Sequence, residues 1–433
     1  MATHHQLDPQ TGLDLQDFRG SAEEKTVKRI LKFITAENIV SPASAFINLV
    51  IHNSNASDGT SFSDAYVSLQ ISYELQEAIE TDYDRGCPES KLVYLKDILN
   101  ISILKNFQTC GVDAIEGYHD VCQQAFLRLL EFLREKKNHE KAIQKLLATT
   151  ALLSSDNKET HIMAGLAHHL FSQLVLGKKY EVDKYANQLP KECDCGCKAK
   201  ICEGDTSVGS WRTWYGRVDI VLNHTIAVAF WKIKTNDAEE DNVDEDEPQR
   251  KRRNKETNDS CDICEEVETL TDLKVLKQIL AEAVTNGFAQ VNKDKNTLSH
   301  LLIPTFGATA DHVSICLYDP ESDCLLHSNE ELDLWYSKEA GKLNVNTIIV
   351  IWLFLNFTIF TKKQVAALLD LDKSGIHDDL KEHLKYYRNA VTKANLVSRT
   401  PSGRPWENAN LLVKSMKDHF ISTCYKFMTY HTI

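Results

Sequence analysis

The sequence predicts an α/β protein in which a sheet-containing core lies between two mainly helical segments. Three observations support this prediction. Strand-like apolar stretches lie between residues 216 and 230 and again between 301 and 327. On both sides of this region, apolar residues recur at three-and-four spacing, as in helices. The 433 residues are 42% hydrophobic, which is enough for two or three domains with a sizeable buried core.

The segment from residue 22 to 155 is predicted to be mainly helical. Helical spacing is clear over residues 27–34, 93–104 and 125–147. No pattern in this segment is typical of an active site. We therefore expect its helices to pack against the rest of the protein or to bind a protein partner.

The segment from residue 156 to 330 contains the predicted core, made of helices and strands in alternation. In chain order these are a helix at 160–176 with Glu159 near its start, strands at 216–222 and 226–230, a helix at 273–286, and strands at 301–306, 313–318 and 324–327. The strands are bounded by turn residues such as those at 223–225. This order predicts a mixed sheet flanked by helices.

The segment from residue 331 to 433 again reads as helical, mainly over 364–396. Its stretch 348–360 is the most apolar part of the chain, but its length of about thirteen residues is short of the ~20 that a membrane-spanning helix needs. We expect a buried element and no membrane association. The polar first twenty residues resemble no secretion signal, so an intracellular location is expected.

An acid and a lysine occur on consecutive predicted strands. Asp219 lies on the first strand of the hairpin, and Lys234 lies at the end of the second. Hydrolysis of a phosphodiester with Mg²⁺ needs one or two carboxylate ligands that leave water on the ion. A lysine can orient the attacking water and offset the developing negative charge. The two residues are therefore candidates for one catalytic cluster.

The order of Gly216, Asp219, a turn and an apolar strand ending in Lys234 resembles the PD-(D/E)xK nuclease superfamily, which has a restriction-endonuclease-like or RecB-like fold. The resemblance covers about residues 155–330. It implies a Mg²⁺ or Mn²⁺ cofactor and DNA or RNA as the substrate. Asp219 takes the place of the metal-binding aspartate, the Ile233 carbonyl that of a second ligand, and Lys234 that of the catalytic lysine.

Lys232 departs from the pattern of the superfamily, because it stands where the second metal-binding carboxylate is expected. An ammonium group there would repel the cation. Some relatives carry this acid on the following helix, where Glu282 is the candidate, and many carry a glutamine there near the substrate, as Gln278 would be. Two functions stay open: an active nuclease, or a catalytically inactive nuclease-fold protein that binds nucleic acid or a protein partner.

Six of the 12 cysteines form two groups around the hairpin. They are Cys193, Cys195, Cys197 and Cys202 before it, and Cys261 and Cys264 after it. Their close spacing inside a reducing compartment favours a structural Zn²⁺ over disulfides, with an iron–sulfur cluster less favoured and reduced thiols in loops as the remaining interpretation. The adjacent His168 and His169 would point in different directions on a helix, and we expect both to be structural.

Residues 236–268 form a low-complexity insert of an acidic run followed by a basic run. We expect this insert to be disordered. The basic run contains Arg250, Lys251, Arg252 and Arg253, and it is typical of a nuclear localisation signal or a phosphate-contacting patch. Because the net charge is −13, any basic surface that contacts nucleic acid must be local.

Overall fold

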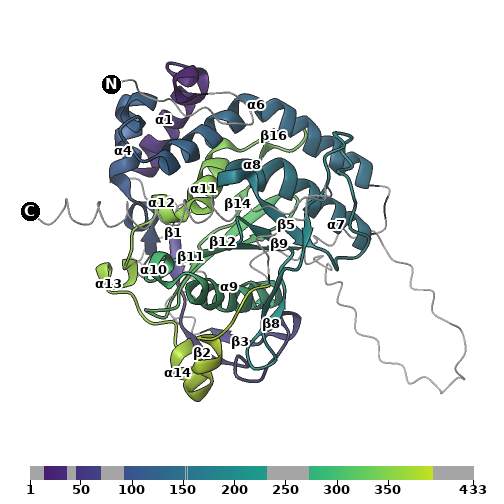
Figure 1. Cartoon of the computed structure of the whole chain (residues 1–433), viewed down its shortest axis with the longest axis vertical. Coiled ribbons are helices and arrows are strands. Elements are labelled where there is room, and N and C mark those ends of the chain that lie inside the picture. Colours follow the sequence, from purple (N-terminus) through teal and green to yellow (C-terminus); the bar gives the residue numbers. More distant parts are fainter. Residues whose placement is uncertain are drawn as a thin grey trace, which may run out of the picture.

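The computed structural model of the protein describes residues 14–36, 45–69, 92–151, 153, 155–231 and 273–393. These residues form a mixed α/β structure in which one large sheet has helices on both faces (Figure 1). The mixed sheet flanked by helices that the sequence predicts is therefore confirmed.

The main sheet contains ten strands and is mostly antiparallel. Along the sheet its strands are β4 (Leu92–Tyr94), β1 (Ala45–Asn48), β13 (Cys324–Ser328), β12 (His312–Asp319), β11 (Ile303–Ala308), β10 (Ile226–Phe230), β9 (Ile220–Leu222), β5 (Tyr180–Asp183) and β6 (Glu203–Gly204), with β14 (Leu332–Asp333) beside β12. The pairs β10–β11 and β5–β6 are parallel. Strand β9 pairs antiparallel with β5 on one side and with β10 on the other.

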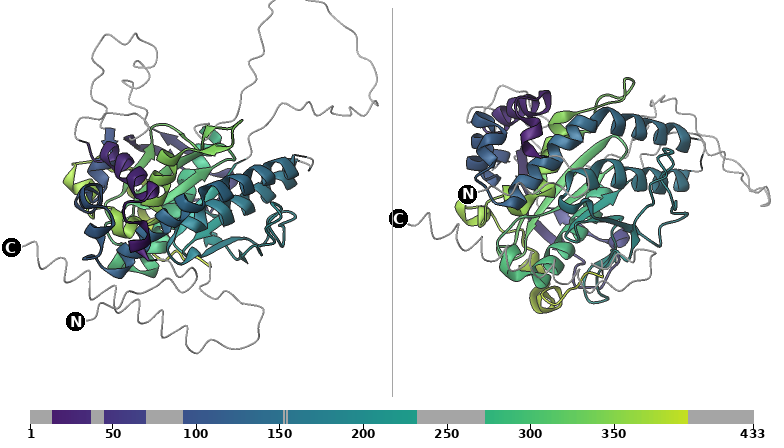
Figure 2. Two further views of the ribbon diagram at one scale, coloured as in Figure 1. Left: turned by 90° about the horizontal axis from the view of Figure 1, so that it is seen from above. Right: turned by 45° about the horizontal axis from the view of Figure 1, so that its top comes forward.

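Helices cover the two faces of this sheet (Figures 1 and 2). On one face lie α6 (Asp120–Thr150), α7 (Ser155–Leu166), α8 (Ser172–Leu174) and α11 (Val345–Leu355), and on the other lies α9 (Leu273–Lys293). Because both faces are buried, the strands are apolar nearly throughout rather than alternating with polar residues. In β9, Ile220 and Leu222 pack in the core that includes α6 and α11, and Val221 packs in the core that includes α9.

Shorter elements surround these layers. The remaining helices are α1 (Ala22–Ile34), α3 (Leu95–Ile98), α4 (Ile101–Cys110), α5 (Val112–Ile115), α10 (Lys295–Leu298), α12 (Phe357–Phe360), α13 (Val365–Leu368), α14 (Ile376–Leu380) and α15 (Leu384–Tyr387). Three small hairpins are formed by β2 (Ile51–Ser54) with β3 (Val67–Leu69), β7 (Ser207–Gly209) with β8 (Tyr215–Arg217), and β15 (Trp335–Ser337) with β16 (Lys342–Leu343).

The predicted hairpin is present with a three-residue turn, but the strand expected over 216–222 is split: Gly216 belongs to β8 of a small separate hairpin, and only Ile220–Leu222 forms β9. Ile220 pairs with Val228, and the turn residues Asn223 and His224 have φ values of +47° and +61°. The helix expected over 160–176 is interrupted, because Ala167–Phe171 forms a π-helical turn between α7 and α8. The N-terminal segment contributes strands β1 and β4 to the main sheet in addition to its helices.

The apolar stretch 348–360 forms most of α11 and all of α12, and its large side chains are buried in the core. This outcome confirms the expectation of a buried element. Among the described residues, no helix combines the length and the apolar character needed to cross a membrane.

Candidate functional site

Four acidic residues whose charges act on one another lie where β5 and β9 approach α7 and α9. Asp183 is the last residue of β5, and Asp219 directly precedes β9. The Asp183 N–H donates a hydrogen bond to the Asp219 carbonyl at 3.0 Å, so the two residues are cross-strand neighbours. Glu159 on α7 and Glu282 on α9 complete the group, since the charge of Glu159 acts on Asp219 and the charge of Asp219 acts on Glu282. We call these four residues the carboxylate group.

Asp219 has a strongly perturbed pKa. Burial is the main cause that raises the pKa of Asp219 to about 7, the hydrogen bond from the Phe230 N–H lowers it, and the negative charges of Glu159 and Asp183 raise it further. That hydrogen bond reaches Oδ2 of Asp219 at 2.6 Å and holds the carboxyl group against the end of β10. A carboxyl group with this pKa is about half protonated near physiological pH, and a nearby cation would favour its charged form.

Glu282 is the most buried acid of the group, with 1% of its surface exposed. Burial and then the charge of Asp219 raise the pKa of Glu282 well above its usual range, while the hydrogen bond from Gln278 lowers it. Gln278 Nε2 donates to Oε1 at 2.9 Å. Oε2 has no hydrogen-bond partner among the described residues. Because buried acceptors are nearly always satisfied in native proteins, this oxygen can accept a hydrogen bond or bind a cation.

Cationic and aromatic side chains lie beside the carboxylate group. Arg217 Nε donates to Asp183 Oδ2 at 2.9 Å, and the Arg217 guanidinium lies 4.9 Å from the centre of the Tyr185 ring. The Lys184 ammonium lies 4.8 Å from the same ring, and 58% of Tyr185 is exposed. On α9, Lys277 is next to Gln278, and its ammonium lies 4.9 Å from the Tyr66 ring.

The structure brings together three of the residues predicted from the sequence, Asp219, Gln278 and Glu282. Ile233, Lys234 and Lys232 lie outside the described residues, as do Cys261, Cys264 and the basic run 250–253. Asp183 was missed at the sequence level. Its signal was an acid at the end of the short stretch Tyr180–Asp183, which becomes informative only once β5 is known to pair with β9.

A second group of side chains lies between the helical layer and the loop that joins β5 to β6. The Sγ atoms of Cys193, Cys195 and Cys197 and a ring nitrogen of His169 all lie within 4.8 Å of one another, so the four residues could hold a metal ion. Cys202 is exposed and is not part of this group. We call the four residues the His–Cys group.

The two adjacent histidines do point in different directions. His168 Nδ1 lies 3.3 Å from the Tyr180 hydroxyl, whereas His169 Nε2 lies 3.1 Å from Cys195 Sγ. His168 thus faces Tyr180, whereas His169 faces the cysteines. No direct sequence signal points to His169, because the cysteines it meets are more than twenty residues away along the chain.

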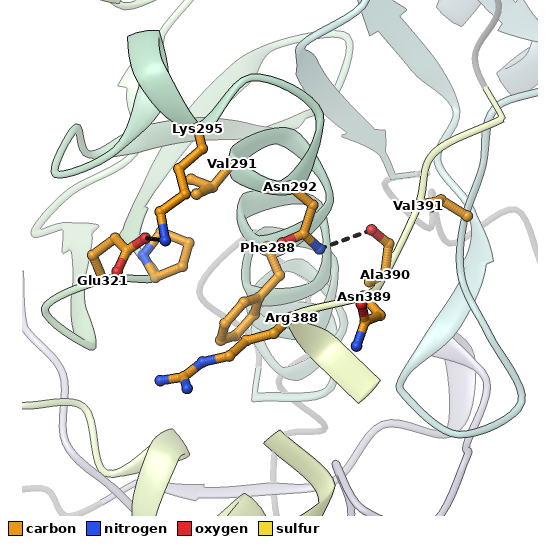
Figure 3. A pocket seen from close by; sticks show the side chains of 10 residues that line it. Phe288, Val291, Asn292, Lys295, Glu321, Arg388, Asn389, Ala390 and Val391 are labelled. Atoms are coloured by element: carbon orange, nitrogen blue, oxygen red, sulfur yellow. Dashed lines mark hydrogen bonds and ion pairs between the residues drawn. The ribbon is translucent and has the colours of Figure 1, made fainter. Parts of the chain in front are cut away.

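The open pocket in Figure 3 is separate from both groups. It lies at the C-terminal end of α9 and is lined by Phe288, Asn292 and Arg388, among others. Three of its polar side chains are already paired, since Asn292 Nδ2 donates to the Ala390 carbonyl at 2.9 Å and Lys295 lies 3.3 Å from Glu321. None of its lining residues belongs to the carboxylate group.

Comparisons with protein-family models, with curated proteins and with solved structures give no match. The fold and the two sites therefore define the chain as a mixed α/β protein with a partly buried carboxylate group and a separate His–Cys group. Its function must be argued from the chemistry of these side chains, because a fold alone does not determine an activity.

Proposed function

We propose that this protein is a metal-dependent nuclease of the PD-(D/E)xK type, which hydrolyses phosphodiester bonds of DNA or RNA. The observation that carries the proposal is the buried, unpartnered Oε2 of Glu282 in a side chain whose pKa is raised by burial and by the charge of Asp219. A buried and a partly buried carboxylate that repel each other are unfavourable when both are charged and no cation lies between them. They are favourable when a divalent ion neutralises both.

The residues present fit Mg²⁺ or Mn²⁺. Both ions prefer oxygen ligands, usually one or two carboxylates from the protein together with water and substrate oxygens. Asp219 and Glu282 would hold the ion, and Asp183 and Glu159 add negative charge nearby. When bound, the ion would supply an activated water and offset charge on the scissile phosphate.

In the proposed site, Glu282 on α9 would supply the second metal-binding carboxylate that position 232 lacks, as happens in some members of the superfamily. Gln278 orients Glu282 through Oε1, and the Phe230 N–H orients Asp219 through Oδ2. Each metal ligand thus has one oxygen fixed by the protein, which reduces the entropy lost on binding the ion. Lys234 keeps the proposed role of positioning water.

The order of elements also supports the proposal. In chain order, helix α7, strands β5, β9 and β10, helix α9 and strand β11 occur as helix, strands, helix, further strand, with shorter elements between them, and this is the order that the resemblance implies. The carboxylates occupy corresponding places: one on the first helix, two at strand ends, one on the second helix.

The surroundings of the carboxylate group suit nucleic acid as the substrate. Exposed aromatic rings can stack on bases, and lysine and arginine contact phosphates. Tyr185 with Lys184 and Arg217 offers both at one place. Arg217 is held by Asp183, so a phosphate contact through its free N–H groups would be aligned with the acids.

The test is cleavage of labelled single-stranded DNA, double-stranded DNA and single-stranded RNA with Mg²⁺ or Mn²⁺. We expect cleavage by the unmodified protein and a loss of at least a hundredfold in Asp219→Ala and Glu282→Ala. Glu321→Ala removes an acid outside the carboxylate group and should keep full activity. No cleavage of any substrate with either ion, together with salt-sensitive nucleic-acid binding, would instead favour the inactive binding protein.

A further inference from the structure

We propose that His169, Cys193, Cys195 and Cys197 bind one Zn²⁺ in a closed Cys₃His site, which fastens the loop between β5 and β6 to the helical layer. This site is independent of the carboxylate group. It differs from the six-cysteine clasp expected from the sequence, because a histidine supplies the fourth ligand and Cys202 takes no part.

The distances from His169 Nε2 match a tetrahedral zinc site. Its separations from the three sulfurs are 3.1 Å to Cys195, 3.4 Å to Cys193 and 3.6 Å to Cys197. With Zn–S bonds of about 2.3 Å and Zn–N bonds of about 2.0 Å, tetrahedral geometry places ligand nitrogen and sulfur about 3.5 Å apart. All four ligand atoms lie within 4.8 Å of one another, a spacing that suits a single ion.

Hydrogen bonding alone does not account for this convergence. A ring nitrogen of histidine has either one lone pair or one proton to share. Three sulfurs lie around this one nitrogen, so two of them would gain nothing from it. A common ion at the centre satisfies all four atoms at once, and sulfur with imidazole is the donor set that zinc prefers.

The loop has a conformation that turns its sulfurs inward. The Cys193 N–H donates to the Ala199 carbonyl at 2.8 Å, and the Gly196 N–H donates to the Cys193 carbonyl at 3.2 Å. Gly196 has a φ of +86°, which favours glycine. The Cys197 N–H donates to Cys195 Sγ at 3.4 Å, which helps to hold that sulfur on the inner side of the loop.

The helical side of the site also departs from regular geometry. His169 lies in the π-helical turn Ala167–Phe171, in which the Ser172 N–H donates to the Ala167 carbonyl. Such turns are rare in proteins, and those that occur are often found at functional sites, where the extra residue changes the direction of a side chain. Further up the helix, His161 forms an ion pair with Asp194 of the same loop. The loop and the helix are therefore joined at two points.

A closed site with four protein ligands is structural, since it leaves no open position for a substrate. The loop follows Asp183 of β5, and the helix bears Glu159 near its start. Zinc would thus stiffen two of the elements around the carboxylate group. Its binding does not depend on whether that group is catalytic.

The test is elemental analysis of the full-length protein purified without added zinc or chelator. We expect about one zinc per chain, retained in Cys202→Ser and lost in Cys195→Ser. His169→Cys creates a Cys₄ donor set and should keep the zinc, whereas His169→Phe should lose it. This contrast separates a ligand from a packing residue.

Cobalt provides a second measurement on the folded protein. Replacement of zinc by Co²⁺ should give the intense visible absorption of a tetrahedral site together with sulfur-to-cobalt charge transfer. The spectrum should change in His169→Cys and stay the same in Cys202→Ser. Absence of metal from the unmodified protein, iron in place of zinc, or loss of zinc in Cys202→Ser or Cys261→Ser would overturn the four-residue site.

Discussion

Asp219→Asn should make the protein more stable at alkaline pH while removing its proposed activity. The asparagine has nearly the same shape, and its side-chain oxygen can still accept the hydrogen bond from the Phe230 N–H. What it lacks is the charge, which burial and the neighbouring acids make unfavourable. Stability and metal binding should therefore change in opposite directions.

The size of the effect follows from proton linkage. The pKa of Asp219 is about 7 in the folded protein and about 3.9 in an unfolded chain. Because the folded pKa is the higher one, the folded protein binds more protons, and its stability falls as pH rises from about 4 to about 7. The carboxyl group then destabilises the fold by about 4 kcal/mol at pH 8, and by less than about 1 kcal/mol at pH 4.

Urea unfolding of parent and variant at both pH values, without Mg²⁺ or Mn²⁺, measures this difference. We expect the stabilisation by Asp219→Asn to be about 3 to 4 kcal/mol larger at pH 8 than at pH 4. Asp205 is the matched control with the opposite sign, because its hydrogen bond from Ser207 lowers its pKa. Asp205→Asn should therefore lose stability at pH 8. A pH-independent effect of Asp219→Asn would refute the reasoning.

Three further predictions concern the metal, Lys232 and the basic run. Binding of Mn²⁺, measured by calorimetry, should weaken as the pH falls below about 7 and approach a tenfold loss for each pH unit, because Asp219 must lose its proton. Lys232→Glu adds a ligand in place of an ammonium and should raise cleavage at least tenfold, a gain that Asp219→Ala in the same background removes. A reporter fused to residues 249–255 should enter the nucleus, and alanine at Arg250, Lys251, Arg252 and Arg253 should keep it in the cytosol.

Much of the core could be predicted because its signals are local. The hairpin of β9 and β10, helix α9 and strands β11 to β13 each have an apolar pattern with clear turn residues at the ends. Periodicity identifies such elements, although it says nothing about which strands become neighbours. The pairing of β1 with β13 joins residues far apart in the chain, so the sequence offered no sign that the N-terminal segment enters the sheet.

The residues of the candidate sites also fall into two classes, those that the sequence could predict and those that it could not. Asp219, Gln278 and Glu282 were accessible to prediction because each lies on an element with a strong pattern. Asp183 depends on the pairing of β5 with β9, and His169 depends on a π-helical turn, which no periodicity reveals. Chemistry that relies on irregular backbone is therefore the part that sequence reasoning misses.

The parallel pairing of β10 with β11 has a consequence for how the chain can vary in length. Parallel neighbours need a crossover, here provided by α9, and the sheet fixes the end of β10 through the bond from the Trp231 N–H to the Ala308 carbonyl. Residues 232–272 connect two anchored ends. Doubling the length of such a connection costs only about 0.6 kcal/mol in closure entropy. Homologues could thus acquire or lose whole segments between β10 and α9 while the sheet and its carboxylates stay in register.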